Sequence, residues 1–165
     1  MRERIVHPLA PVYDKNSRVL VLGTMPSPKS RELGFYYSHP QNRFWRILAE
    51  LYGEALPRGN GEKTAFLLRR RIALWDVLKS CEISGADDAS IRNPVANDIA
   101  GLLKRTGIRT VFTTGSKAAS LYRRLCRASV GMDAVALPST SPANCRNWTY
   151  ETLLGAYRIL RNYTG

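Results

Sequence analysis

Short apolar runs alternate along this sequence with segments whose apolar residues are spaced for one face of a helix. The runs are 18–23, 72–78, 108–115 and the first part of 133–145, and the first of them, RVLVLG, is rich in β-branched residues. The spacing predicts helices at 41–53, 61–71, 95–107, 116–128 and 147–163. This alternation favours a parallel sheet with helices on both of its faces.

The predicted fold is α/β, a three-layer α/β/α sandwich around a central, mainly parallel four-stranded sheet. We expect it to occupy residues 1–165 as a single domain, because the sequence shows no repeat, low-complexity segment or linker. Segments 24–30 and 79–94 are rich in Pro, Ser and other turn residues, so both are predicted to be loops. Ser116 is expected to cap the helix that begins there.

Ligands of such sheets bind at the carboxyl ends of the strands, where two loops stand out, 23–42 and 137–145. The second loop contains LPSTSPAN, whose hydroxyls and backbone N–H groups could hold a phosphate backbone. A plain serine-rich turn explains that sequence equally well. Ser116 and Lys117 begin a predicted helix, and a helix N-terminus can also hold phosphate.

The charge of the chain points to a polyanionic partner. The formal net charge is +12, and 19 of the 25 basic residues are Arg. Basic side chains displace counterions from phosphates, and Arg contacts phosphate in a bidentate way. The basic residues also cluster, at 69–71 and at 123–127. We therefore expect nucleic acid as the partner, rather than a charge that serves only solubility.

Composition also excludes several classes of protein. No apolar run reaches the roughly 18 residues that a membrane span needs, so we expect no membrane partner. Cys81, Cys126 and Cys145 are scattered without CxxC spacing, and only two His are present, so we expect neither a metal nor any other cofactor. Isolated cysteines fit a reducing cytoplasm, the expected location, where the chain is expected to act as a monomer.

The stretch GFYYSHPQNRFWRIL, residues 34–48, is unusual because it combines many aromatic rings with a Pro-fixed turn and a carboxamide. Tyr37 could stack on a flat base or could be a half-buried core aromatic. Asn42 could cap the helix, read a base edge or hold a water. His39 is interpreted as a structural hydrogen-bond partner. Asp76 could be catalytic, but we favour the interpretation that it ties down a loop.

Taken together, these motifs resemble the uracil-DNA glycosylase superfamily over almost the whole chain. LGTMPSPKS occupies the place of that superfamily's first motif, and LPSTSPAN the place of its second. HPQNRFW is similar to the HP-x-NRFW run of the mismatch-specific uracil glycosylases. LGTMPS, YYSHPQNRFW, ALWDVL and SPAN occur in the order that is typical of the hypoxanthine-DNA glycosylase branch.

The resemblance implies a monofunctional DNA glycosylase of base excision repair that acts on DNA containing a damaged base. Such an enzyme flips the base out and hydrolyses its N-glycosidic bond, leaving an abasic site. In the hypoxanthine branch the catalytic residue is the asparagine of HPxNxFW, which is Asn42 here and would position water. The base pocket would then comprise Gly23, Thr24, Met25, Pro26, Tyr37 and Ser139, and the DNA contacts Ser27, Ser116, Lys117, Ser141, Pro142, Ala143, Asn144 and Arg146.

One departure from the superfamily pattern bears on the substrate. Uracil glycosylases carry an Asp or Asn in the first motif, where this chain has Thr24, Met25 and Pro26, none of which can activate water. We therefore expect hypoxanthine as the first substrate. The alternatives are a uracil or G:U and G:T mismatch glycosylase, and, from a different class, a non-catalytic module that binds DNA or RNA.

Overall fold

The computed structural model describes residues 2–165 and contains the predicted parallel sheet. Its four strands lie in the order β3-β2-β6-β7 and are parallel throughout. They are β2 (Val19–Gly23), β3 (Ile72–Asp76), β6 (Thr110–Thr114) and β7 (Val135–Leu137). All five residues of β2 are buried, as expected for a central strand covered on both faces.

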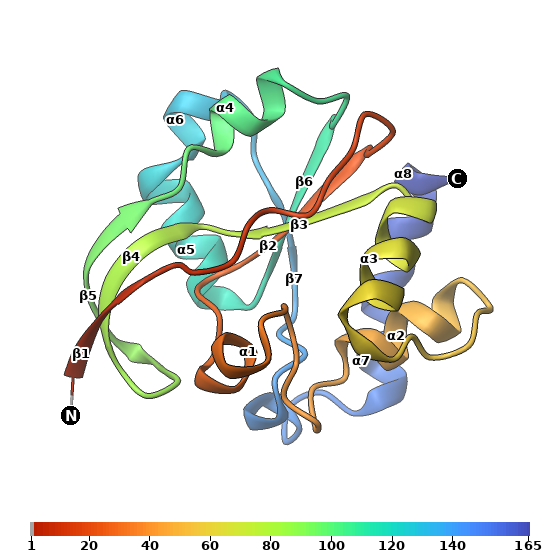
Figure 1. Ribbon diagram of the computed structural model, residues 1–165, viewed down its shortest axis with the longest axis horizontal. Helices are drawn as coiled ribbons and strands as arrows, with labels where there is room; N and C mark the ends of the chain where they lie inside the picture. The colour runs from red at the N-terminus through yellow and green to blue at the C-terminus, as the bar shows by residue number, and fades with distance from the viewer. Residues whose placement is uncertain (1) are drawn as a thin grey trace.

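Helices cover both faces of this sheet, so the predicted three-layer α/β/α architecture is confirmed (Figure 1). One face packs against α2 (Phe44–Leu51), α3 (Gly59–Arg69), α7 (Tyr150–Tyr157), the 3₁₀ turn η2 (Arg158–Leu160) and α8 (Arg161–Thr164). The other packs against α4 (Ile99–Lys104), α5 (Ser116–Leu125) and α6 (Arg127–Val130). Alternate residues of β2 point into the two cores, Val19 and Val21 into the first and Leu20 and Leu22 into the second.

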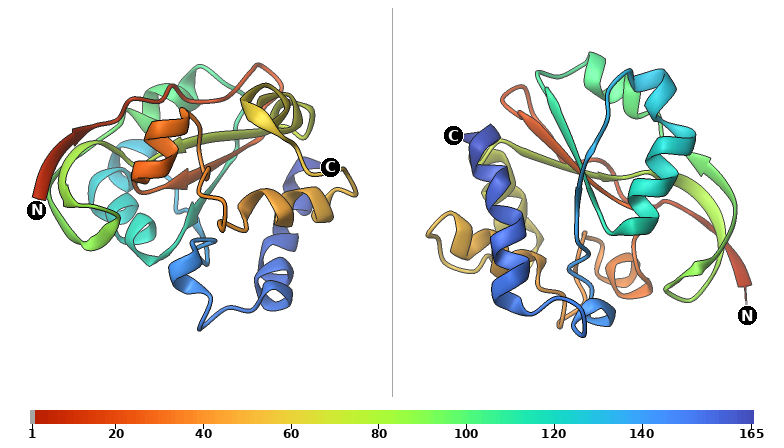
Figure 2. Two further views of the ribbon diagram at one scale, coloured as in Figure 1. Left: turned by 60° about the horizontal axis from the view of Figure 1, so that its bottom comes forward. Right: turned by 180° about the vertical axis from the view of Figure 1, so that it is seen from behind.

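A second sheet corrects the prediction for residues 79–94, which are not a loop. Its order is β1-β4-β5, with antiparallel pairing of β1 (Arg2–Val6), β4 (Leu78–Ser84) and β5 (Asp87–Ala96). One face of β4 packs into the core beside α5, whereas β5 is largely exposed. Polar residues suit such a one-sided sheet. The two views in Figure 2 show it curving away from the parallel sheet.

Several predicted boundaries were also wrong. Residues 28–33 form α1 (Pro28–Leu33), which Ser27 caps by accepting from Ser30 N at 3.2 Å. The helix predicted at 95–107 shrinks to α4, because residues up to Ala96 pair in β5 and the helix ends at Lys104, with Arg105 and not Gly107 as its C-cap. The helix predicted at 116–128 divides at Cys126 into α5 and α6, and Gly115, not Ser116, is its N-cap.

Candidate active site

A cavity of about 350 Å³ opens at the carboxyl ends of β2, β3 and β6. It lies where the sequence motifs meet, since α1, the loop before α2 and the loop after β7 all contribute to its wall. The expected catalytic residue, Asn42, lines it, together with ten of the residues expected to bind the base or the DNA: Gly23, Thr24, Met25, Pro26, Ser27, Tyr37, Ser139, Ser141, Pro142 and Ala143. The strand ends thus bring together motifs that are more than 100 residues apart.

At the floor of the cavity, three polar side chains lie close together around Gly23. A Cβ atom added to Gly23 would lie 2.6 Å from Asp76 Oδ1, 3.2 Å from Tyr37 Oη and 3.6 Å from Thr114 Oγ1. Gly23 and Asp76 are also register partners at the ends of β2 and β3. Glycine is therefore required at this position by the space that its neighbours occupy, not by its backbone angle.

Asp76 ties down a neighbouring segment, the role that the sequence favoured for it, and it also lines the cavity. It is 4 % exposed, and His7 Nε2 donates to its Oδ2 at 2.7 Å, which ties the N-terminal segment to the floor. Leu9 N donates to His7 Nδ1 at 3.2 Å, so the ring proton resides on Nε2. No hydrogen bond from residues 2–165 reaches Oδ1, and Asp76 lines the cavity. Its second oxygen is thus available to a ligand.

Tyr37 is held rigidly in an uncommon backbone conformation. Its φ is +54°, which is rare for an aromatic residue and costs about 1 kcal/mol or more. One face of its ring stacks on Phe44, with centroids 3.9 Å apart, and its hydroxyl lies 3.1 Å from Thr114 Oγ1. Burial and the nearby Asp76 carboxylate both raise the pKa of Tyr37, so it remains a neutral phenol.

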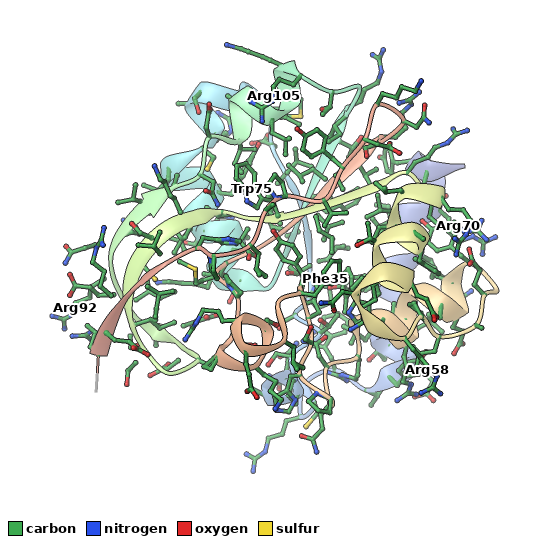
Figure 3. All side chains as sticks on the ribbon, viewed as in Figure 1. Phe35, Arg58, Arg70, Trp75, Arg92 and Arg105 are labelled. Carbon is green, nitrogen blue, oxygen red and sulfur yellow. The ribbon has the colours of Figure 1, made fainter. Side chains whose placement is uncertain are left out.

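The other aromatic residues of 34–48 are structural. Phe35, Tyr36, Phe44 and Trp45 are all buried and belong to the core. Figure 3 labels Phe35 in the interior between α1 and α3. His39 Nδ1 accepts from Gln41 N at 3.1 Å, as expected of a structural histidine. Four residues of this stretch line the cavity: Tyr36, Tyr37, His39 and Asn42.

Asn42 is bonded through one end of its carboxamide. Its Oδ1 accepts from Phe44 N, at the start of α2, at 2.9 Å, and from Thr140 Oγ1 at 2.8 Å. Arg43, not Asn42, is the N-cap of α2, so the capping role considered for Asn42 is wrong and its bond to Phe44 N is a local turn contact before the helix. The Nδ2 atom takes part in neither of the two bonds.

The loop after β7 is fixed by its own polar side chains. Ser141 is the N-cap of the 3₁₀ turn η1 (Pro142–Asn144), and its Oγ accepts from Ala143 N at 3.2 Å. Asn144 Nδ2 donates to Ser139 O at 3.0 Å, so this amide holds the loop and does not line the cavity. Arg43 Nη1 donates to Trp148 O at 2.6 Å, which joins this loop to the start of α2.

Three further residues that were expected to contact DNA lie outside the cavity wall. They are Ser116 and Lys117, at the start of α5, and the exposed Arg146. The start of α5 nevertheless adjoins the cavity, because a Cβ on Gly115 would lie 3.3 Å from Ser139 Cβ. Ser116 and Lys117 therefore lie beside the cavity and not in its wall.

The tip of the β4–β5 hairpin is a part of the wall that sequence reasoning missed. Gly85, Ala86 and Asp88 line the cavity from the second sheet. Although Asp88 reaches solvent, desolvation by the surrounding protein raises the pKa of its carboxyl, Asp87 and Asp76 add to this effect, and Lys117 opposes it. Residues 79–94 were predicted to be a loop, and nothing in their sequence indicated that they would reach the cavity.

The family of the chain follows from its similarity to known proteins. The model of the uracil DNA glycosylase superfamily matches residues 10–160, which include the motifs that line the cavity. The chain belongs to this superfamily. It is a DNA glycosylase, a hydrolase of N-glycosyl bonds that acts on damaged DNA.

Two relatives are both named hypoxanthine DNA glycosylase. The protein from Methanosarcina acetivorans is 37% identical over 137 residues, which are 82% of this chain and 85% of the relative. The one from Methanosarcina barkeri is 34% identical over 139 residues, covering 83% and 87%. A solution NMR structure from M. acetivorans, provisionally assigned as a uracil DNA glycosylase, aligns with a TM-score of 0.79 and 30% identity over 97% of this chain and 99% of that one.

The basic clusters of this glycosylase do not surround the cavity. Residues 69–71 precede the first residue of β3, whereas the cavity lies at its last, Asp76. Arg69 and Arg70 both pair with Glu54, and Arg127 pairs with Asp133. In Figure 3, Arg70 and Arg105 lie at the outer edges of the molecule, away from α1. Basic residues nearer the mouth are therefore the better candidates for phosphate contacts.

Lys117→Ala should weaken DNA binding and flatten its salt dependence. If Lys117 neutralises one phosphate, the slope of log K against log salt should fall in magnitude by about 0.9. Arg123→Ala is the matched control, since Arg123 is exposed on the same helix about 9 Å further from the mouth at 1.5 Å per residue. Fluorescence anisotropy across a salt series measures both slopes. Equal slopes for the two variants would place the DNA elsewhere.

No described helix is long and apolar enough to cross a membrane. Residues 2–165 also contain no group of three or more His, Cys, Asp or Glu side chains that could hold a metal ion.

Proposed function

We propose that this glycosylase removes hypoxanthine from deoxyinosine in DNA, with Asn42 as the catalytic residue. The observation that carries the proposal is the position of Asn42 in the wall of a cavity that also presents the ring of Tyr37 and the free oxygen of Asp76. The printed names of the two relatives support hypoxanthine as the substrate.

The cavity suits a base that has been flipped out of the duplex. Phe44 covers one face of the Tyr37 ring, and the base would stack on the other. Base stacking on an aromatic side chain contributes about 1–3 kcal/mol. Because the Tyr37 ring is already fixed by Phe44 and Thr114, little side-chain entropy would be lost when the base binds.

Asp76 would help to select deaminated bases. Its Oδ1 can only accept a hydrogen bond while the carboxyl is ionised, and hypoxanthine carries a ring N–H beside its carbonyl. Adenine, from which hypoxanthine arises, has an unprotonated nitrogen at that place. Uracil and xanthine share the N–H group, and so does guanine, which is why all of them belong in the substrate panel.

The reaction would be hydrolytic. The bond between C1′ and the base nitrogen breaks, its electron pair stays with the base, and water adds to the cationic sugar carbon, which DNA phosphates help to stabilise. None of the residues that line the cavity is a lysine, so the described residues offer no amine there for a Schiff base. The product would be an abasic site with an intact backbone, formed by a monomer in the cytoplasm.

Alkali cleavage of an end-labelled oligonucleotide with a single deoxyinosine tests the proposal. A glycosylase leaves an abasic site that alkali cuts, whereas a non-catalytic module only shifts the oligonucleotide in a gel. Parallel substrates with uracil, xanthine, adenine and guanine give the range. Borohydride should trap no covalent complex. If the enzyme releases uracil but not hypoxanthine, hypoxanthine is the wrong substrate and uracil takes its place.

Tyr37→Ala should weaken productive base capture by about 1–3 kcal/mol, the contribution of one stacked base. Tyr37→Phe should lose far less, because the ring and its contact with Phe44 remain and only the bond to Thr114 is removed. The enzyme concentration that gives half-maximal single-turnover rate measures capture in both variants. Equal damage by Phe and Ala would assign the effect to the hydroxyl and not to stacking.

A further inference from the structure

The hydrogen bonds of Asn42 use only the oxygen of its carboxamide. Oδ1 accepts one bond from Phe44 N and one from Thr140 Oγ1, which occupy its two lone pairs. No hydrogen bond within residues 2–165 involves Nδ2, which carries both N–H groups, and Asn42 lines the cavity. The group that Asn42 has left for a ligand is therefore a donor.

The orientation of this carboxamide is determined by its partners. A backbone N–H can only donate, so rotating the amide by 180° would bring Nδ2 against the N–H of Phe44 and leave both unsatisfied. With Oδ1 fixed by Phe44, the Thr140 hydroxyl must donate to it. Thr140 is 1 % exposed, so its hydroxyl has no access to bulk water as an alternative partner.

Thr140 is also held independently of Asn42. Arg43 N donates to Thr140 O at 3.2 Å, so the two loops are joined by backbone as well as by side chains. The contact between Thr140 and Asn42 spans 98 residues of sequence and connects the two motifs of the superfamily. The Thr140 hydroxyl therefore lies at a fixed point from which it can orient the amide.

We propose that Thr140 is a positioning residue that holds Asn42 with its N–H groups toward the base, so that Asn42 acts as a hydrogen-bond donor to the leaving group. This inference rests on the proposed function. As the C1′–N bond breaks, negative charge develops on the ring nitrogens and the carbonyl oxygen of the base, where N–H donors stabilise it. The base then takes a proton from solvent, and the water that attacks C1′ releases one to solvent.

The donor role differs from water positioning through Oδ1, which the sequence suggested for Asn42. To orient water for attack, an amide would accept a hydrogen from it, and both lone pairs of Oδ1 are already occupied. The two roles make opposite predictions for a carboxylate at this position, because a carboxylate accepts hydrogen bonds but donates none.

Asn42→Asp distinguishes the two roles by its pH profile. The carboxylate keeps both bonds, to Phe44 N and Thr140, but lacks the N–H groups, so the single-turnover rate at pH 8 should be lower by a factor of about 10² or more. As the pH falls toward the ordinary range of an Asp, protonation supplies one O–H donor, and the rate relative to wild type should rise. A relative rate that rises with pH instead would overturn the donor role.

Thr140→Val tests the positioning role, because it removes the hydroxyl at nearly constant shape. We expect a single-turnover rate at least 10-fold below wild type with unchanged DNA affinity, and recovery to within about 3-fold in Thr140→Ser, which keeps the donor. The double variant Asn42→Ala/Thr140→Val should be no slower than Asn42→Ala alone, since Thr140 acts through Asn42. Additive losses, or equal rates for Thr140→Val and wild type, would overturn the positioning role.

Thermal unfolding of each variant separates these effects from a folding defect, and rates are compared only at temperatures where all the variants are folded. If Asn42→Ala releases hypoxanthine as fast as wild type, both the proposed catalytic residue and this inference fail. If Asn42→Ala is slow but the relative rate of Asn42→Asp rises with pH, the proposed function stands and only the donor role fails.

Discussion

Replacing Asn42 with alanine should lower the single-turnover rate of hypoxanthine release by a factor of about 10² or more, the usual scale for removing one positioned catalytic group. The first motif of this glycosylase contains Thr24, Met25 and Pro26 where uracil glycosylases carry an acid or an amide, so no neighbouring group there can replace the lost carboxamide. Quenched reactions with enzyme in excess over a deoxyinosine duplex measure the rate without interference from product release.

The fold and the DNA affinity should survive this substitution. The bond to Phe44 N is a single hydrogen bond, whose loss costs about 1 kcal/mol, and the Thr140 hydroxyl left without its acceptor adds about 1–3 kcal/mol. DNA affinity comes mainly from phosphate contacts, which Asn42 does not supply. Asn144→Ala is the control asparagine, and a slow Asn144→Ala beside a fast Asn42→Ala would move the chemistry to the second loop.

Gly23→Ala should disrupt the cavity floor and nearly abolish activity. The new methyl group would lie 2.6 Å from Asp76 Oδ1, closer than a carbon and an oxygen can approach, and 3.2 Å from Tyr37 Oη. Asp76 cannot yield easily because His7 holds its other oxygen. Overpacking of this kind costs about 1–3 kcal/mol of stability, and the displaced groups are those expected to contact the base.

Gly155→Ala is the matched control for this substitution. Gly155 lies inside α7 with nothing within 4 Å of the added Cβ, so alanine there should stabilise the protein by about 0.5–1 kcal/mol through helix propensity. Melting curves and deoxyinosine cleavage are measured for both variants. Wild-type activity in Gly23→Ala would show that the floor can rearrange, and that neither Asp76 nor the Tyr37 hydroxyl needs its present position.

The parallel sheet was predictable because its central strands are short, mostly apolar runs that are largely buried on both sides, as the fully buried β2 shows. The β1-β4-β5 sheet was not, because its strands are buried on one face at most. In β5, the residues that pair with β4 include Asp87, Arg92 and Val95. In the sequence alone, this mixture of charged and apolar residues resembles a loop. The pairing of β1 with β4 joins residues about 80 positions apart, which no local pattern reveals.

The loops that form the site were predictable, but the contacts that orient its side chains were not. Tyr37 and Asn42 were singled out by residue type and by the order of their motifs. That Thr140 bonds Asn42, or that the free oxygen of Asp76 lies over Gly23, depends on how strand ends far apart in sequence are packed together. Likewise, Ser116 did not cap α5, because Gly115 already occupies the N-cap position.

The bond between His7 and Asp76 shows that a residue outside the family match contributes to the cavity. The superfamily match starts at residue 10, so a boundary drawn from family likeness would discard His7, the one hydrogen-bond partner that the Asp76 carboxylate has among the described residues. The strand that carries the chain to His7 looks peripheral in Figure 1, yet it determines how an acid at the bottom of the cavity is held. Truncations that remove His7 would therefore release the Asp76 carboxylate in the cavity, and they should be judged by base selectivity as well as by yield.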